Sequence, residues 1–307
     1  MKFGPTATMN NNNFELISII IPCFNSGETL DRTINSINNQ TWKNKEIIVV
    51  NDGSSDKYTL EEIEKLKDNS HIKVLNQENL GLPSARNNGA KHASGNFLYF
   101  IDSDDWLELD ALELMYKFYK LNNQEGFVFS DIIIEGKINT IIKKEYNFFE
   151  QLFLNQLPYS IFISRENWIK YGGYDEKMKL GYEDWEFNIR LGCHDQYGIR
   201  LPKPLFHYNV SDSGMLLSKT SKYHAQIVHY IMKQNKEIYK LRNLFKLWIK
   251  WRGKESCFPI SIYFLWYLII KLIPNTLVSK IFILVRNFKW FFTRNKILLS
   301  IKNFRIL

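Results

Sequence analysis

Four short apolar runs between residues 16 and 101 limit the folds that this chain can adopt. The runs are β-branched or aromatic and almost uninterrupted, and polar stretches separate them: Leu16–Ile21, Glu46–Val50, Ile72–Leu75 and Phe97–Ile101. Such runs are typical of parallel strands that are buried on both faces. The sequence therefore predicts a β-α-β-α-β series with right-handed crossovers, which is an α/β layer fold.

The stretches between these runs carry the periodicity of amphipathic helices. Leu30, Ile34 and Ile37 fall on one face between the first two strands, and Ser26 stands where an N-cap is expected. Residues 60–66 repeat the pattern before the third strand. Further along, the pattern predicts two helices and two strands, at Leu109–Tyr119, Trp185–Leu191, Phe127–Ile134 and Ile161–Ile163.

The net charge of +8 hides two regions of opposite sign. Residues 1–221 carry 23 Lys and Arg against 30 Asp and Glu, whereas residues 222–307 carry 17 against two. The first 13 residues have one basic residue and no apolar core, so we expect a disordered leader there rather than a secretory signal. The chain thus divides into a leader (1–13), a globular domain (14–221) and a basic helical C-terminal region (222–307).

Composition excludes two further classes of protein. With 45% hydrophobic residues the chain can bury a large core, so it is not of the disordered type. Cys23, Cys193 and Cys257 are too few for a disulfide framework and too far apart for a metal motif. We expect three buried thiols in a reducing compartment.

The basic C-terminal region has an amphipathic pattern that allows two interpretations. Leu241, Leu244, Phe245 and Trp248 share a helical face, and the uncharged stretch 256–270 is shorter than the roughly 20 residues that span a membrane. The favoured interpretation is helices lying in the headgroup region of an anionic membrane. The alternative is helices packed on the globular domain or on a second copy of the chain. Nucleic acid is not an expected partner, because the aromatic residues come in apolar blocks.

Two acidic clusters follow the second and fourth predicted strands. They are Asn51-Asp52-Gly53-Ser54-Ser55-Asp56 and Asp102-Ser103-Asp104-Asp105. Either cluster alone is explained by turn chemistry or, for Asp104 or Asp105, by a helix cap. In an open parallel sheet both lie at the carboxyl edge, where ligands bind. Carboxylates gathered there raise each other's pKa unless a cation or a hydrogen-bond donor compensates.

The loops that bind phosphate through backbone amides are absent at this edge. The first strand ends in Pro22-Cys23-Phe24-Asn25-Ser26-Gly27, which matches neither the dinucleotide-binding nor the nucleoside-triphosphatase motif. Carboxylates repel a phosphate, but Mg²⁺ or Mn²⁺ held by one or two of them bridges to a diphosphate. The spacing therefore predicts a metal-bridged diphosphate.

Six segments in this order resemble glycosyltransferase family 2, which has the GT-A fold, a Rossmann-like mixed sheet flanked by helices. The resemblance is to bacterial members that build surface polysaccharide, and it covers about residues 14–217. The segments are Ser18-Ile19-Ile20-Ile21-Pro22-Cys23-Phe24-Asn25, Val49-Val50-Asn51-Asp52-Gly53-Ser54-Ser55-Asp56, Asn79-Leu80-Gly81-Leu82-Pro83-Ser84-Ala85-Arg86-Asn87-Asn88-Gly89, Phe100-Ile101-Asp102-Ser103-Asp104-Asp105-Trp106, Gly172-Gly173-Tyr174-Asp175-Glu176 and Gly181-Tyr182-Glu183-Asp184-Trp185.

The resemblance implies a nucleotide-sugar site. Asp52 would hold the base, in a pocket lined by Pro22, Phe24 and Asn25. Arg86 would contact the base or the phosphates, with a structural ion pair as the alternative. The Asp-x-Asp motif would place Asp102 and Ser103 toward the ribose or sugar and Asp104 on Mn²⁺ or Mg²⁺. Asp105 and Trp106 would be structural.

The resemblance also implies the acceptor side. Asp184 would be the catalytic base that takes the proton of the acceptor hydroxyl. Glu183 and Trp185 would orient Asp184 or bind the acceptor. A helix N-terminal acid is the alternative for both carboxylates. His207 is either a third metal ligand or a core histidine.

The implied activity is transfer of one hexosyl or N-acetylhexosaminyl unit, with inversion, from a nucleotide diphosphate donor with a lean to UDP. The acceptor would be a saccharide or a lipid-linked saccharide at the inner face of the cell membrane, where the protein would be cytoplasmic and peripheral. The Gln-x-x-Arg-Trp motif of processive synthases is absent. The alternatives are a nucleotidyltransferase of the same fold class, which usually has a basic Gly-rich loop, and a non-catalytic protein that binds nucleic acid or membrane. Self-association is left open.

Overall fold

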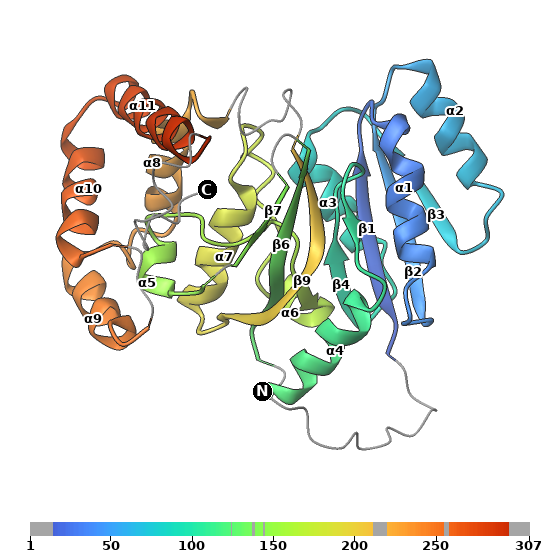
Figure 1. The fold of residues 1–307 in the computed structure, drawn as a ribbon, viewed down its shortest axis with the longest axis horizontal. Helices are drawn as coiled ribbons and strands as arrows, with labels where there is room; N and C mark the ends of the chain where they lie inside the picture. Colours follow the sequence, from blue (N-terminus) through green and yellow to red (C-terminus); the bar gives the residue numbers. More distant parts are fainter. Residues whose placement is uncertain are drawn as a thin grey trace.

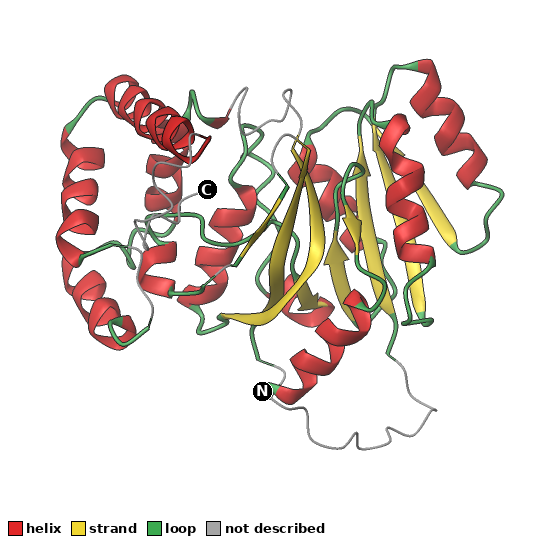
Figure 2. Ribbon diagram, viewed as in Figure 1, coloured by secondary structure: helices red, strands yellow, loops and turns green. Residues whose placement is uncertain are grey.

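One mixed sheet organises the described part of the chain (Figure 2). The computed structural model describes residues 15–123, 125–136, 139–143, 145–210, 220–254 and 258–294. The expected leader (1–13), the residues 211–219 and 295–307, and Cys257 lie outside these ranges. The strands are β1 (Ile17–Cys23), β2 (Lys45–Asp52), β3 (Ile72–Gln77), β4 (Phe97–Phe100), β5 (Trp106–Leu107), β6 (Phe127–Gly136), β7 (Thr140–Ile142), β8 (Phe162–Ser164) and β9 (Gly198–Val210).

The strand order reverses at β1: β2 and β3 are added on one side of it, and β4 is added on the other. The sheet runs β3-β2-β1-β4-β8-β6-β9-β5, with β7 paired to β6. The first four of these strands are parallel, β8 is antiparallel to β4 and β6, and β9 is parallel to β6 but antiparallel to β5. The predicted β-α-β-α-β series is confirmed, and the carboxyl ends of β1, β2 and β4 meet at one edge.

Helices cover both faces of the sheet (Figure 1). They are α1 (Gly27–Asn38), α2 (Lys57–Leu66), α3 (Leu82–Lys91), α4 (Ala111–Leu121), α5 (Phe148–Gln151), α6 (Arg165–Lys170), α7 (Glu183–Cys193), α8 (His224–Gln234), α9 (Leu241–Trp251), α10 (Ile260–Leu272) and α11 (Asn275–Arg294). Alternate residues of a strand point to opposite faces. Ile19 and Ile21 of β1 accordingly pack in one core with residues of α1, α2 and α4. Ile20 packs in the other core with residues of α3, α6 and α7.

A third core joins the C-terminal helices to the globular domain. It contains buried residues of α5 and α7 together with residues of α8, α9, α10 and α11, and Figure 1 shows these helices beyond the β6 side of the sheet, away from β1 and β2. Hydrogen bonds cross the same boundary, since the Tyr239 hydroxyl donates to the Leu152 carbonyl at 2.7 Å and the Tyr230 hydroxyl to Asp175 Oδ2 at 2.6 Å. Packing on the globular domain is therefore present. No helix in the described ranges is both long enough and apolar enough to cross a bilayer.

Some local expectations were wrong. The four residues of α9 that were expected to share one face do not have the same exposure. Leu244 is buried, whereas Leu241 and Phe245 are exposed. Ser26 does precede α1, but its hydroxyl makes no cap and instead lies 2.6 Å from Ser103 Oγ. Of the two described thiols, Cys23 is buried and Cys193 is half-buried.

His224 ties the C-terminal helices to the segment that precedes α7. Its Nδ1 lies 3.1 Å from the Tyr182 hydroxyl, and its ring stacks on Phe282 with centroids 3.6 Å apart. Burial lowers the pKa of His224 to about 3. The folded protein therefore keeps this ring neutral at a pH where an unfolded chain protonates it.

We predict that His224 makes stability depend on pH below about 6.5. The unfolded chain binds a proton there that the folded chain excludes, so stability falls as pH falls, at about 1.4 kcal/mol per pH unit. Between pH 7.5 and 5.5 the wild type should lose about 1.4 kcal/mol more unfolding free energy than His224→Asn. Urea unfolding at the two pH values measures this difference. The exposed His71→Asn should behave as the wild type, and parallel curves for all three proteins would refute the prediction.

Candidate active site

Asn25 connects the loops that follow β1 and β2 through hydrogen bonds. This residue has φ +50°, a left-handed conformation that asparagine tolerates. Its Oδ1 accepts hydrogen bonds from the amides of Ser55 at 2.8 Å and Asp56 at 3.2 Å. Next to it Pro22 is buried and Phe24 is 47% exposed. The Phe24 ring is therefore exposed at this edge, on a backbone that hydrogen bonds hold in place. That Phe24 contacts a base stays a prediction.

Asp52 holds the turn that enters α3. Its Oδ1 accepts from Gln77 Nε2 at 2.8 Å and from the Leu80 amide at 2.9 Å, and its Oδ2 accepts from the Gly81 amide at 3.0 Å. These donors compensate the buried carboxylate, which is 5% exposed. Its predicted contact with the base stays a prediction.

Arg86 of α3 connects the two halves of the site. Its Nη2 lies 2.6 Å from Asp102 Oδ1, and its Nη1 lies 2.6 Å from Glu183 Oε1. The guanidinium carbon is 4.6 Å from the centroid of the Tyr159 ring, and the side chain is 1% exposed. Burial opposes the charge, but the two carboxylates outweigh burial and raise the pKa of Arg86. The guanidinium thus forms the buried ion pairs that were the alternative interpretation of Arg86, and its contact with base or phosphate stays a prediction.

The acidic loop after β4 contains carboxylates in different environments. Asp105 is fully buried and accepts hydrogen bonds from the Tyr159 hydroxyl and, at 2.8 Å, from the Asn209 amide. Asp104 is half-buried, and burial together with the Asp102 charge raises its pKa to about 6. The suggestion that Asp104 or Asp105 caps a helix was wrong, because the next helix begins at Ala111 after Asp110.

The Asp104 environment fits a divalent cation. No ion pair is found between this carboxylate and another described residue. A backbone hydrogen bond and the charge of Arg32 lower its pKa, but burial and the Asp102 charge outweigh them. The described ranges hold no set of three His, Cys, Asp or Glu side chains arranged around a metal position. The protein would therefore supply one or two carboxylates, the number that Mg²⁺ takes when phosphate and water complete its shell.

The His207 ring lies between an indole and two carboxylates. It lies on β9 opposite Trp106, and the two rings stack with centroids 4.8 Å apart. Its Nε2 is 2.9 Å from Glu108 Oε1, and its Nδ1 is 3.1 Å from Glu135 Oε1. Because both ring nitrogens lie within hydrogen-bond distance of carboxylates, this arrangement favours the structural interpretation of His207, and the metal-ligand alternative stays a prediction.

The first turn of α7 carries the candidate base. Asp184 is half-buried, its Oδ2 accepts from Asn155 Nδ2 at 3.0 Å, and burial raises its pKa. Glu183 is 4% exposed and paired with Arg86, which favours the positioning role over acceptor binding; both stay predictions. The indole of Trp185 is 2% exposed and donates to the Gln151 carbonyl at 2.5 Å, which favours a role in positioning the first turn of α7.

Comparison with known proteins identifies the family. The model of glycosyl transferase family 2 matches residues 18–174, about half of the chain. The chain belongs to this family. The matched region includes Asp52, Arg86 and the Asp102–Asp104 motif and ends before Asp184.

Curated relatives of this family 2 protein are bacterial. GlyA, a glycosyltransferase of Streptococcus pneumoniae serotype 4, is 32% identical over 232 residues, which are 69% of this chain and 33% of GlyA. An uncharacterised glycosyltransferase of Haemophilus influenzae is 31% identical over 66% of this chain and 68% of its own length. TarP, a poly(ribitol-phosphate) β-N-acetylglucosaminyltransferase of Staphylococcus aureus, is 38% identical over 41% of this chain and 39% of TarP. The chain thus spans about a third of several relatives that it matches.

Solved structures confirm the GT-A fold expected for the family 2 chain. Residues 1–349 of S. aureus TarS in complex with UDP-GlcNAc superpose with a TM-score of 0.58 at 19% identity, covering 70% of this chain and 65% of that one. The mannosyltransferase PcManGT of Pyrobaculum calidifontis, in complex with GDP-Man and Mn²⁺, has a TM-score of 0.58 at 15% identity, covering 89% and 86%.

Sequence patterns missed three residues around the acids of this family 2 site. The Tyr159 hydroxyl accepts from the Asp102 amide at 2.8 Å and donates to Asp105, so it spans the acidic loop. Burial and the nearby acids, Asp105 first among them, raise the pKa of Tyr208. Asn155 binds the candidate base. None of the three lies in the six motif segments. Tyr159 precedes the predicted strand at Ile161–Ile163, whereas Asn155 and Tyr208 lie near no predicted strand end, so no local signal marked them.

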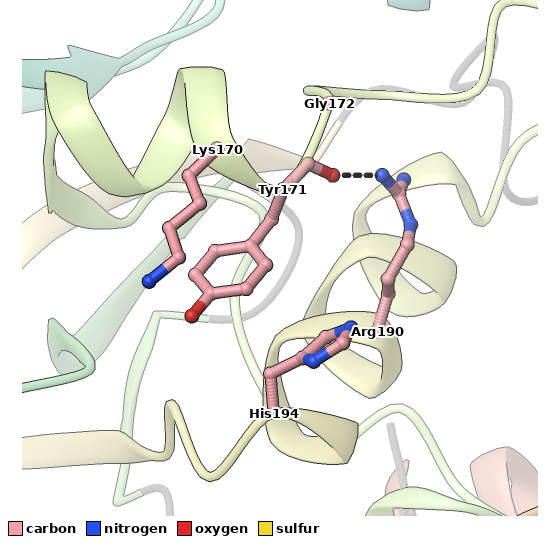
Figure 3. Close-up of a pocket in the computed structure, with 5 residues that line it drawn as sticks. All are labelled: Lys170, Tyr171, Gly172, Arg190 and His194. Atoms are coloured by element: carbon pink, nitrogen blue, oxygen red, sulfur yellow. Dashed lines mark hydrogen bonds between the residues drawn. The ribbon is translucent and has the colours of Figure 1, made fainter.

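A separate cavity lies at the other end of α7 (Figure 3). It has a volume of about 590 Å³ and is lined by Lys170, Tyr171, Gly172, Arg190 and His194. The Arg190 guanidinium is already bound to the Tyr171 and Gly173 carbonyls and to Glu186. His194 follows the last turn of α7, whereas Glu183 and Asp184 occupy the first. The cavity therefore does not include the candidate catalytic residues.

We predict that Arg86→Met is strongly destabilising. Removing one member of a buried ion pair leaves Asp102 and Glu183 uncompensated, which should lower the unfolding free energy by about 3–5 kcal/mol. The deficit should shrink from pH 8 to pH 5, because protonation then neutralises the unpaired carboxylates. Urea unfolding of the variant and wild type measures both effects.

Lys57→Met is the matched control. Lys57 pairs with Glu61 at 3.5 Å on the surface of α2, where an ion pair contributes less than about 1 kcal/mol. A similar loss of stability in the two variants would contradict the importance of the buried pair.

Proposed function

We propose that this chain transfers one sugar, with inversion, from a UDP-sugar to a saccharide or a lipid-linked saccharide. The observation that carries the proposal is the Arg86 bridge, which holds the Asp102 loop against the first turn of α7. Donor-side and acceptor-side carboxylates thereby converge on one edge of the sheet. Family membership favours this activity over the nucleotidyltransferase and non-catalytic alternatives.

The donor would lie along the carboxyl ends of β1, β2 and β4. Phe24 offers an exposed ring to the base, and Asp52 lies on the adjoining strand end. Asp102, paired with Arg86, and the buried Ser103, whose Oγ lies 2.6 Å from Ser26 Oγ, would adjoin the ribose or sugar. Two proteins of the same fold were solved with nucleotide sugars, TarS with UDP-GlcNAc and PcManGT with GDP-Man. The TarS complex with UDP-GlcNAc supports the choice of UDP.

Asp104, with Asp102 beside it, would hold Mn²⁺ or Mg²⁺. When bound, the ion neutralises the charge that builds up on the leaving diphosphate. Asp104 must be deprotonated for this role, and its raised pKa of about 6 makes the proton a competitor of the ion. Mn²⁺ in the PcManGT complex supports a divalent ion in this fold.

Asp184 would remove the proton of the acceptor hydroxyl. As the acceptor oxygen bonds to the anomeric carbon, the bond from that carbon to the diphosphate oxygen breaks and the proton passes to the Asp184 carboxylate. Attack from the side opposite the leaving group inverts the anomeric centre. Burial raises the pKa of Asp184, which makes it a better proton acceptor, and Asn155 fixes one of its oxygens.

We place the acceptor at the inner face of the cell membrane, with the protein bound peripherally. The support is the charge of residues 222–307, where 17 Lys and Arg face two acids. Anionic lipids attract such a segment.

We predict that Asp184→Asn abolishes turnover without abolishing donor binding. Loss of a general base should lower kcat by about 100- to 10,000-fold, while the affinity for UDP changes less than about twofold, because Asp184 serves the acceptor. The donor is first chosen as the UDP-sugar that raises the melting temperature most in the presence of Mn²⁺. UDP release then measures turnover, and calorimetry measures UDP binding.

Asp68→Asn is the control for this substitution. Asp68 is an exposed acid after α2, so its variant should keep wild-type turnover. Full activity of Asp184→Asn would overturn the base assignment.

We predict that Mn²⁺ binding weakens below about pH 6. The folded carboxyl of Asp104 has a pKa of about 6 without the ion, so the apparent Mn²⁺ affinity should fall by about tenfold per pH unit below that value. Electron paramagnetic resonance of free Mn²⁺ in the presence of UDP measures the affinity at pH 7.5, 6 and 5. Asp104→Asn should bind Mn²⁺ weakly at all three, and undiminished turnover in EDTA would contradict the metal proposal.

A further inference from the structure

Exposed apolar side chains are concentrated on the last three described helices. Of the 18 large hydrophobic side chains found exposed in the described ranges, nine lie on α9, α10 and α11, and they are 45–77% exposed. They are Leu241, Phe245, Ile249, Ile262, Leu265, Leu268, Leu272, Leu277 and Leu284. Exposed apolar surface on this scale marks an interaction site more often than a free surface. We call these nine residues the outer apolar surface.

The outer apolar surface follows from helical spacing. Leu241, Phe245 and Ile249 are four residues apart on α9, which places them in one row. On α10 the exposed residues are three or four apart, and Tyr263 and Tyr267 on the same helix are buried in the third core. Each helix thus has one apolar face packed on the protein and a second one in contact with water.

The charge on the same helices has one sign. The sequences of α9, α10 and α11 contain no Asp or Glu and eight basic residues: Arg242, Lys246, Lys250, Lys271, Lys280, Arg286, Lys289 and Arg294. Lys250 is paired with Asp195 of the globular domain at 3.1 Å, whereas Arg242, Lys246 and Lys271 are exposed around the outer apolar surface. A partner that complements this surface therefore needs apolar groups for the apolar residues and negative charge for the basic residues beside them.

We infer that α9, α10 and α11 lie in the headgroup region of an anionic bilayer, with the outer apolar surface toward the acyl chains. An interfacial helix has this composition, with apolar residues on one face and Lys or Arg beside them. The inference rests on the peripheral location proposed above, and it assigns that location to named residues. It does not depend on the sugar-transfer chemistry.

A second copy of the chain fits this surface less well. A two-fold contact would bring the same basic helices together, and these helices carry no acid to compensate. A contact with the acidic globular domain of another copy would be heterologous and would not close into a dimer. Anionic lipid satisfies the charge and the apolar surface at once.

The membrane surface and the candidate base share one core. Trp185, next to Asp184, is buried with Leu244 of α9 and with Tyr263 and Tyr267 of α10. A bilayer contact on the outer side of these helices would therefore orient the acceptor side of the site relative to lipid. A lipid-linked acceptor in that membrane would then lie close to Asp184, because the helices that pack beneath Asp184 contact the same membrane.

The inference is tested by sedimentation of the full chain with vesicles. The wild type should bind vesicles of phosphatidylglycerol and phosphatidylcholine at least tenfold more tightly than phosphatidylcholine alone, and less tightly at high salt. Phe245→Ser/Leu265→Ser should bind the anionic vesicles at least tenfold more weakly. Lys246→Glu/Lys271→Glu should do the same and also lose most of the salt dependence.

Matched controls carry equivalent changes elsewhere on the surface. Leu109→Ser/Leu121→Ser alters two exposed leucines of another region, and Lys57→Glu/Lys73→Glu reverses two exposed charges. Both should bind vesicles within twofold of the wild type. Equal loss in variants and controls would overturn the inference, as would a wild type that binds neither vesicle.

Two further readouts separate the competing explanations. If the wild type self-associates without lipid and Phe245→Ser/Leu265→Ser is monomeric, the surface is an interface between copies and the inference fails. The rise in melting temperature with UDP and Mn²⁺ should be unchanged in all variants. A chain that binds vesicles but not UDP would support this inference while refuting the proposed function.

Discussion

The site depends on one buried cation. Burying a guanidinium costs free energy unless charged partners and hydrogen bonds replace water, and Arg86 meets this condition only while Asp102 and Glu183 both remain beside it. The rigid fork of an arginine sets the directions of its two partners. The Asp102 loop, α3 and the first turn of α7 are therefore held in one arrangement, although Arg86 and Glu183 are 97 residues apart.

This arrangement separates structural carboxylates from reactive ones. Arg86 neutralises Asp102 and Glu183, backbone amides and Gln77 compensate Asp52, and Tyr159 with the Asn209 amide binds Asp105. Asp104 and Asp184 have no such ion pair among the described residues. Burial raises the pKa of both, as it does for Asp105 and Glu183, so the missing charged partner and not the raised pKa sets Asp104 and Asp184 apart. An acid that its surroundings leave uncompensated is the one best prepared to take a metal ion or a proton. The proposed division of roles follows from this difference.

Local patterns predicted the strands well and the contacts poorly. Apolar runs identified β1 to β4, β6 and β8 within a few residues, since burial on both faces leaves a continuous signal. They missed β9, whose polar residues alternate irregularly, and with it the environment of His207, whose partners Glu108 and Glu135 are 99 and 72 residues away. Likewise the motif placed Arg86 at the site, but only the fold shows that two acids enclose it.

In the C-terminal helices, too, the sequence pattern predicted the elements but not their contacts. Spacing marks an apolar stripe without saying what covers it, so packing and membrane contact looked like alternatives in the sequence. On α9 the consecutive residues Leu244 and Phe245 divide between the third core and the surface. Packing therefore accounts for one side of each helix and leaves the other side in water. Exposed apolar area is unfavourable and these helices carry only positive charge, so the membrane contact that we propose would use the face that packing leaves open.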